Sequence, residues 1–138
     1  MNTPYNTLDI ANFIIELAIE NKKEMPILKL QHILYFINAQ FLIEDNTPLI
    51  DQNFERWPFG PINLELRNHT REFGSSPINK TLTILKTIDN KPYDWEVIDF
   101  DNKVIDTETK NRIAKTFGKI IDTPLFKMID ITTNQEIY

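Results

Sequence analysis

The segment from Pro26 to Glu44, PILKLQHILYFINAQFLIE, constrains the fold of this chain more than any other. Read as a helix, it carries apolar residues on two stripes instead of one. The broad stripe contains Ile27, Leu30, Ile33, Leu34, Ile37 and Phe41, and the narrow stripe contains Leu28, Tyr35 and Leu42. A helix with two apolar stripes packs against neighbours on two sides, which places it at the centre of a helical bundle. Pro26 suits the first turn, where its missing N–H has no intrahelical acceptor.

Two polar residues, Gln31 and Asn38, lie seven positions apart and fall between these stripes. Polar groups inside a protein need hydrogen-bond partners, so one interpretation is that both side chains bond backbone ends or water within the bundle. The other interpretation is that they contact a ligand or a partner. The sequence leaves both open.

Apolar periodicity predicts two further helices, over residues 7–21 and 107–121. Asn6 or Thr7 can cap the first, and Asp106 or Thr107 can cap the last. The tail after Pro124 is ambiguous between a short helix and an extended segment.

Two segments rich in Thr, Ile, Val and Trp, KTLTILKT and DWEVIDF, flank the turn-like sequence DNKPYD and predict a β-hairpin. With no repeat and no flexible linker, residues 1–138 are expected to form a single domain. The predicted fold is therefore mainly α (α+β), a compact helical bundle with a short extended aromatic joint and a small hairpin.

The aromatic joint is NFERWPFGP, residues 53–61. It predicts a short extended piece that includes Phe54 and Trp57, followed by a helix that begins at Pro61 and stops at Gly74. In one interpretation Phe54, Trp57 and Phe59 cover the bundle while Gly60 and Pro61 launch the helix. In the other, Glu55, Arg56 and Trp57 form an exposed recognition edge, since aromatics and Arg are enriched at interface hot spots.

Residues that carry enzymatic chemistry are scarce. The chain has no cysteine, which excludes disulfides, thiol catalysis and thiolate metal sites. His32 and His69 lack metal-binding spacing, and we expect each to be solvent-facing or partly packed. Three glycines supply no phosphate loop, and Ser75 and Ser76 lack a nucleophile context. The sequence thus predicts no catalytic residue, metal or cofactor, and a protein that is not an enzyme, although twenty acidic residues leave carboxylate pairs open.

Charge and hydropathy limit the classes of partner that this chain is expected to bind. The net charge is −5 and no stripe of Lys or Arg occurs, which disfavours nucleic acid. There is no apolar run of ~18 residues and no signal-like N-terminus, so we expect a cytoplasmic protein without a membrane partner.

Four segments, LDIANFIIELA, PILKLQHILYFINAQFL, PLIDQNFERWPFGPINLELRNHTREFG and SSPI, occur in an order and spacing that resemble the Panacea domain, the SocA-like antitoxin family. The resemblance covers about residues 8–78. Positions on the shared pattern are Asp9, Ile10, Ala11, Leu28, Leu30, Gln31, Leu34, Tyr35, Phe36, Phe54, Trp57, Gly60 and Pro61. The C-terminal end MIDITTNQEIY departs from the family, which often has a Thr-His followed by a Trp there.

The resemblance implies an antitoxin-like interaction module, from a family frequent in bacteria and phages, that neutralises a cognate toxin encoded nearby. One known mode of the family delivers the toxin to a protease as an adaptor. We take Gln31, Tyr35, Glu55, Arg56, Trp57 and Phe59 as the partner-binding candidates, and Gly60 and Pro61 as structural residues. The alternative function is a phage or mobile-element regulator that binds nucleic acid or a host defence protein.

Overall fold

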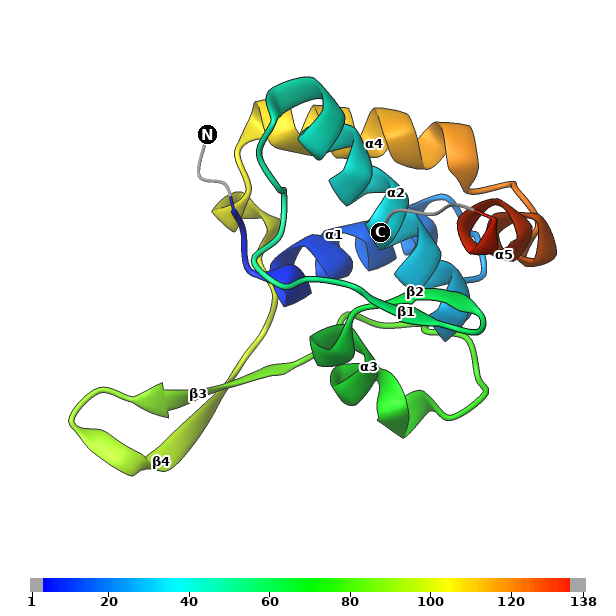
Figure 1. Ribbon diagram of the computed structural model, residues 1–138. Helices are drawn as coiled ribbons and strands as arrows, with labels where there is room; N and C mark the ends of the chain where they lie inside the picture. Colours follow the sequence, from blue (N-terminus) through cyan, green and yellow to red (C-terminus); the bar gives the residue numbers. More distant parts are fainter. Residues whose placement is uncertain (1–3, 135–138) are drawn as a thin grey trace.

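The computed structural model describes residues 4–134 and confirms the mainly helical α+β fold (Figure 1). Its helices are α1 (Thr7–Glu20), α2 (Ile27–Asp45), α3 (Leu64–Thr70), α4 (Thr107–Ile120) and α5 (Leu125–Thr133), with 3₁₀ turns η1 (Arg71–Phe73) and η2 (Asn102–Val104). Two antiparallel pairs accompany them: β1 (Glu55–Trp57) with β2 (Gly60–Ile62), and β3 (Ile84–Ile88) with β4 (Lys91–Ile98). None of these helices is long and apolar enough to span a bilayer.

Helix α2 lies at the centre, as its two stripes predict, and contacts α1, α4, α5 and β2 (Figure 1). Its broad stripe forms much of the core, where Leu30, Ile33, Leu34, Ile37 and Phe41 are buried. The narrow stripe is less uniform: Tyr35 is buried, but Leu42 is 44% exposed. The second side of α2 is therefore covered towards its N-terminal end and open towards its C-terminal end.

The predicted helix termini are largely confirmed. The Asn6 side chain caps α1 by accepting from the Leu8 N–H at 2.9 Å. The Asp106 carboxylate caps α4 by accepting from the Thr109 N–H at 2.8 Å. Pro26 is the N-cap of α2 instead of its first helical residue. The ambiguous tail forms α5 after Pro124.

The prediction that a helix begins at Pro61 is wrong. Pro61 belongs to β2, where it pairs with Arg56 of β1, and α3 begins at Leu64. Asn63 explains the later start, because it is extended and its side chain accepts from the Leu66 N–H at 3.0 Å, which is N-cap geometry. The predicted stop at Gly74 is confirmed, since Gly74 adopts φ +58° and ends η1.

Side chains from α1 and α2 fix the long connections to the bundle. Asn38 accepts from the Leu49 and Ile50 N–H groups at 2.8 and 3.2 Å, which confirms the structural interpretation of this residue. Asn12 of α1 holds Leu82 through both its amide groups.

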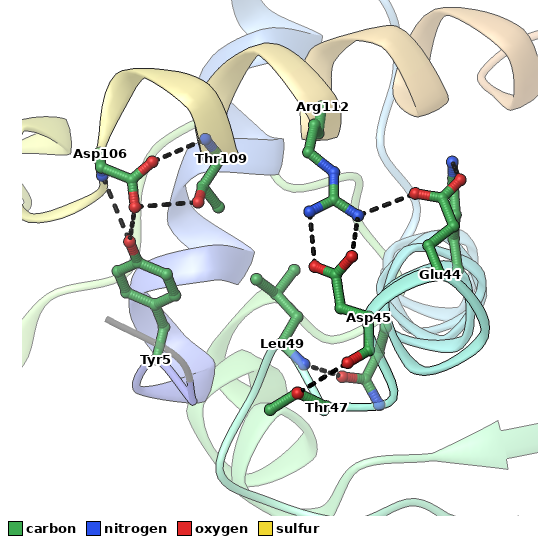
Figure 2. A network of polar contacts seen from close by, with 10 residues as sticks. Tyr5, Glu44, Asp45, Thr47, Leu49, Asp106, Thr109 and Arg112 are labelled. Carbon is green, nitrogen blue, oxygen red and sulfur yellow. Dashed lines mark hydrogen bonds and ion pairs between the residues drawn. The ribbon is translucent and has the colours of Figure 1, made fainter. Parts of the chain in front are cut away.

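Figure 2 shows two polar contacts that join α4 to distant parts of the chain. The Tyr5 hydroxyl donates to Asp106 at 2.6 Å, and the Arg112 guanidinium bonds Asp45 at 2.6 Å and Glu44 at 2.8 Å. Arg112 also lies 3.9 Å over the ring of Phe41. The Arg112 contacts thus hold the C-terminal end of α2 against α4.

Candidate protein-interaction site

The β1–β2 turn is anchored where it approaches α2 and α5. Gly60 is buried with φ +113°, a conformation that L side chains rarely adopt. A Cβ at this position would lie 2.5 Å from His32 Nε2 and 2.7 Å from Thr132 Oγ1. Gly60 is therefore required both for the backbone conformation and for close packing of the turn on α2 and α5.

His32 is fully buried beneath this turn, which corrects the expectation that it is solvent-facing or partly packed. Its Nδ1 lies 2.9 Å from the Leu28 carbonyl oxygen and its Nε2 lies 3.2 Å from Thr132 Oγ1. The sequence did not indicate this burial, because the segment that forms α5 and supplies Thr132 was ambiguous between a helix and an extended segment. His69 is exposed, as expected.

Burial lowers the pKa of His32, and backbone hydrogen bonds to Leu28 and Phe59 act in the opposite direction. The unfolded chain therefore binds a proton more readily than the folded one. We expect the free energy of unfolding to be highest above the unfolded pKa of about 6.5 and to fall as the pH drops below it towards the folded pKa. Urea denaturation between pH 5 and 8 measures this, and His32→Gln should flatten that part of the profile.

Gln31 joins α2 to the residue that follows β2. Its Nε2 donates to the Asn63 carbonyl at 3.0 Å, and its Oε1 accepts from the Asn63 N–H at 2.8 Å. The side chain is 1% exposed. The structural interpretation of Gln31 is the one this geometry supports, because both amide groups are occupied inside the fold.

Replacing Gln31 with alanine should lower the free energy of unfolding by about 1–3 kcal/mol, since the buried N–H and C=O of Asn63 would be left without their partners. Thermal or urea denaturation of the variant measures the loss. Gln52→Ala is the matched control, because Gln52 is exposed and, within the described residues, only its backbone carbonyl accepts a hydrogen bond, from the Asn63 side chain. A stability loss no larger than that of the control would contradict the assignment.

Three of the candidate residues lie on the outer surface of the joint. Glu55 and Arg56 are exposed on β1, and Phe59 is 59% exposed in the turn. The expectation that Phe59 covers the bundle is therefore wrong: the positive φ of Gly60 brings the turn's backbone, and not the Phe59 ring, against α2.

Trp57 is half-buried, which lies between the structural interpretation, a covered side chain, and the recognition interpretation, an exposed one. The Arg67 guanidinium of α3 lies 4.9 Å from the Trp57 ring centroid, and the indole N–H donates to Glu55 at 3.0 Å. Phe54, just before β1, packs edge-on against Tyr35 with ring centroids 5.4 Å apart. Tyr35 is buried and thus supports the joint from beneath.

An open groove of about 960 Å³ lies beside the joint, along the C-terminal half of α2. Its lining comprises Tyr35, Phe36, Asn38, Ala39, Gln40, Leu42, Ile43, Glu44, Asn53 and Phe54. Ile43 is 84% exposed at this position. Phe54 lines the groove and directly precedes β1, so the wall of the groove leads along the chain into the exposed strand.

Hydrogen bonds from Gln40 and Arg112 hold the pKa of Glu44 below its usual range. The Glu44 carboxylate beside the apolar lining is therefore ionised at neutral pH, and it is paired with Arg112.

Sequence reasoning missed this groove. Its signal was present in the run FLIED at the end of α2, where Leu42 and Ile43 are consecutive apolar residues and cannot both face the core. Nothing in the sequence showed that Asn53 and Phe54 would form the opposite wall. Among residues 4–134, no group of three or more His, Asp or Glu side chains is placed to hold a metal ion.

The family described as Antitoxin SocA-like, Panacea domain, matches residues 30–137. The chain belongs to this family. The match begins within α2 and extends past α5, well beyond residue 78, where the visible resemblance ends. The matched range therefore includes most of the divergent C-terminal end.

A curated relative, Antitoxin SocA of Caulobacter vibrioides (strain NA1000 / CB15N), is 36% identical to this chain over 53 residues. The aligned part is 38% of this chain and 28% of the relative, so the match spans little more than a quarter of that protein's length. No solved structure matches the chain.

Proposed function

We propose that this Panacea domain is an antitoxin that neutralises a cognate protein toxin, encoded nearby, by binding it directly. We name the proposed contact region the toxin-contact surface, and it comprises the α2 groove together with Glu55, Arg56, Trp57 and Phe59. Family membership supports the antitoxin role. The observation that supports this location is that an open apolar groove ends at Phe54, next to an exposed strand that carries aromatic and charged side chains.

The chemistry of this surface suits a protein partner. Leu42, Ile43 and Phe59 expose apolar area that a partner can cover, and Glu44 and Glu55 supply charge around it. An open groove between a helix and an extended segment accommodates a helix or loop of another protein through apolar anchors. Gln31 and Tyr35 are both buried, so we propose that they support this surface from inside the fold.

Direct binding and delivery to a protease differ in what happens to the toxin. Binding alone leaves the toxin present in an inactive complex, whereas an adaptor lowers its amount. We propose direct binding as the basic step, to which proteolytic delivery can be added in the cell. Co-expression of this chain with the tagged product of the neighbouring gene tests the proposal.

Rescue of growth with the toxin retained and co-purified supports direct binding. Rescue with a falling toxin level that depends on a cellular protease supports the adaptor mode. Absence of rescue for each adjacent gene product would contradict the antitoxin proposal and favour the regulator alternative.

A further inference from the structure

The β3–β4 hairpin has an apolar face that the described residues leave open. The cross-strand pairs Leu85 with Val97 and Thr87 with Trp95 lie on this side, which we call the hairpin face. Leu85, Trp95 and Val97 are 61%, 60% and 63% exposed. The intervening pair, Lys86 with Glu96, lies on the other side, because side chains alternate across a strand. Charge and apolar surface are therefore separated on opposite sides of the ribbon.

The ribbon receives little support from the bundle. Figure 1 shows it projecting away from the helices, and the partly buried side chains that pack on the core, Ile84 and Phe100, lie at its base. A two-stranded hairpin alone is marginally stable in water. Strand propensity accounts for Val and Trp in a strand, but it does not account for their collection on one side.

We propose that the hairpin face binds the same face of a second copy of this chain. The face has no charged side chain, so the surface that covers it must be apolar and uncharged as well, and an identical face meets both conditions through a two-fold axis. The rest of the ribbon carries two positive and three negative side chains, whose charges nearly cancel: Lys86, Lys91, Asp89, Asp94 and Glu96. Two ribbons therefore repel each other little despite the net charge of −5 on each chain.

The area of the face sets the strength of this dimer. Leu85, Thr87, Trp95 and Val97 offer roughly 500 Å² per copy by typical side-chain areas. Two copies would bury about 1,000 Å² in total, near the lower limit for a specific interface. The dimer should therefore dissociate on dilution. Face-to-face packing would place the two ribbons about 10 Å apart, as in stacked sheets.

Sedimentation of the purified full chain over a wide concentration range tests the proposal. The wild-type protein should pass from monomer towards dimer as its concentration rises. Trp95→Thr keeps strand propensity but removes the largest apolar side chain, and it should weaken the association at least tenfold. Glu96→Thr, on the opposite side, should associate like the wild type. A wild-type chain that is monomeric at every concentration would overturn the proposal, including the case in which the hairpin instead binds another protein.

Cross-linking gives a second readout that does not depend on the stability of the Trp95 variant. The natural chain has no cysteine, so single cysteines can be introduced without a background. With a bismaleimide cross-linker that reaches about 10 Å, the spacing of stacked sheets, Thr87→Cys should form a covalent dimer because Thr87 lies on the hairpin face, while Lys86→Cys should remain largely monomeric. Equal cross-linking of the two variants would contradict face-to-face pairing.

Discussion

Gly60→Ala should lower the free energy of unfolding by about 2–4 kcal/mol, the combined expectation for backbone strain and overpacking. The backbone has φ +113° at this position, and the new Cβ would lie 2.5 Å from His32 Nε2. Neither His32 nor Thr132 can move away easily, because both are buried and hydrogen-bonded. Urea denaturation of the variant measures the loss.

Gly74→Ala is the matched control for that experiment. Gly74 also has positive φ, but nothing lies within 4 Å of the position a Cβ would take. The expected cost is therefore the backbone term alone, about 1–3 kcal/mol for the φ +58° and ψ −122° of Gly74. Equal losses at the two glycines would show that contact with His32 and Thr132 contributes nothing, and the account of the turn would be wrong.

Ile43→Asp should weaken toxin binding by at least about 30-fold, which corresponds to the loss of a hot spot of 2 kcal/mol or more. Ile43 is 84% exposed and lines the groove, so the change removes an apolar contact and adds a second negative charge near Glu44. The melting temperature should hardly change. Pull-down of the tagged toxin beside thermal denaturation separates the two effects.

Val104→Asp is the control for Ile43→Asp. Val104 is β-branched and 50% exposed, but it lies in η2, outside the toxin-contact surface. The Val104→Asp variant should bind the toxin with the affinity of the wild type. Equal weakening by both variants would indicate a general effect of charge and would contradict the placement of the site.

Local pattern predicted the helices well because the determinants of those helices are local. The two stripes of α2, the Asn6 and Asp106 caps and the stop at Gly74 depend on residues within a few positions. The start of α3 could not be predicted in this way. Pro61 is acceptable both in a first helical turn and in a short strand, and pairing with β1 decides between them.

The candidate site was predicted in part. The sequence drew attention to candidate residues of α2 and of the joint, but their burial differs: Gln31 and Tyr35 lie inside, and Glu55, Arg56 and Phe59 lie outside. The full burial of His32 depends on α5, a hundred positions away. Long-range contacts of this kind leave no signal in local periodicity, and the groove beside α2 was missed for the same reason.

Titration calorimetry of the purified chain with the purified product of the neighbouring toxin gene tests the central claim most directly. We expect saturable binding by the wild type and by Val104→Asp, and a large loss of affinity for Ile43→Asp, with all three proteins folded. Growth rescue by a chain that shows no binding to the toxin, or undiminished affinity of folded Ile43→Asp, would contradict neutralisation through the toxin-contact surface.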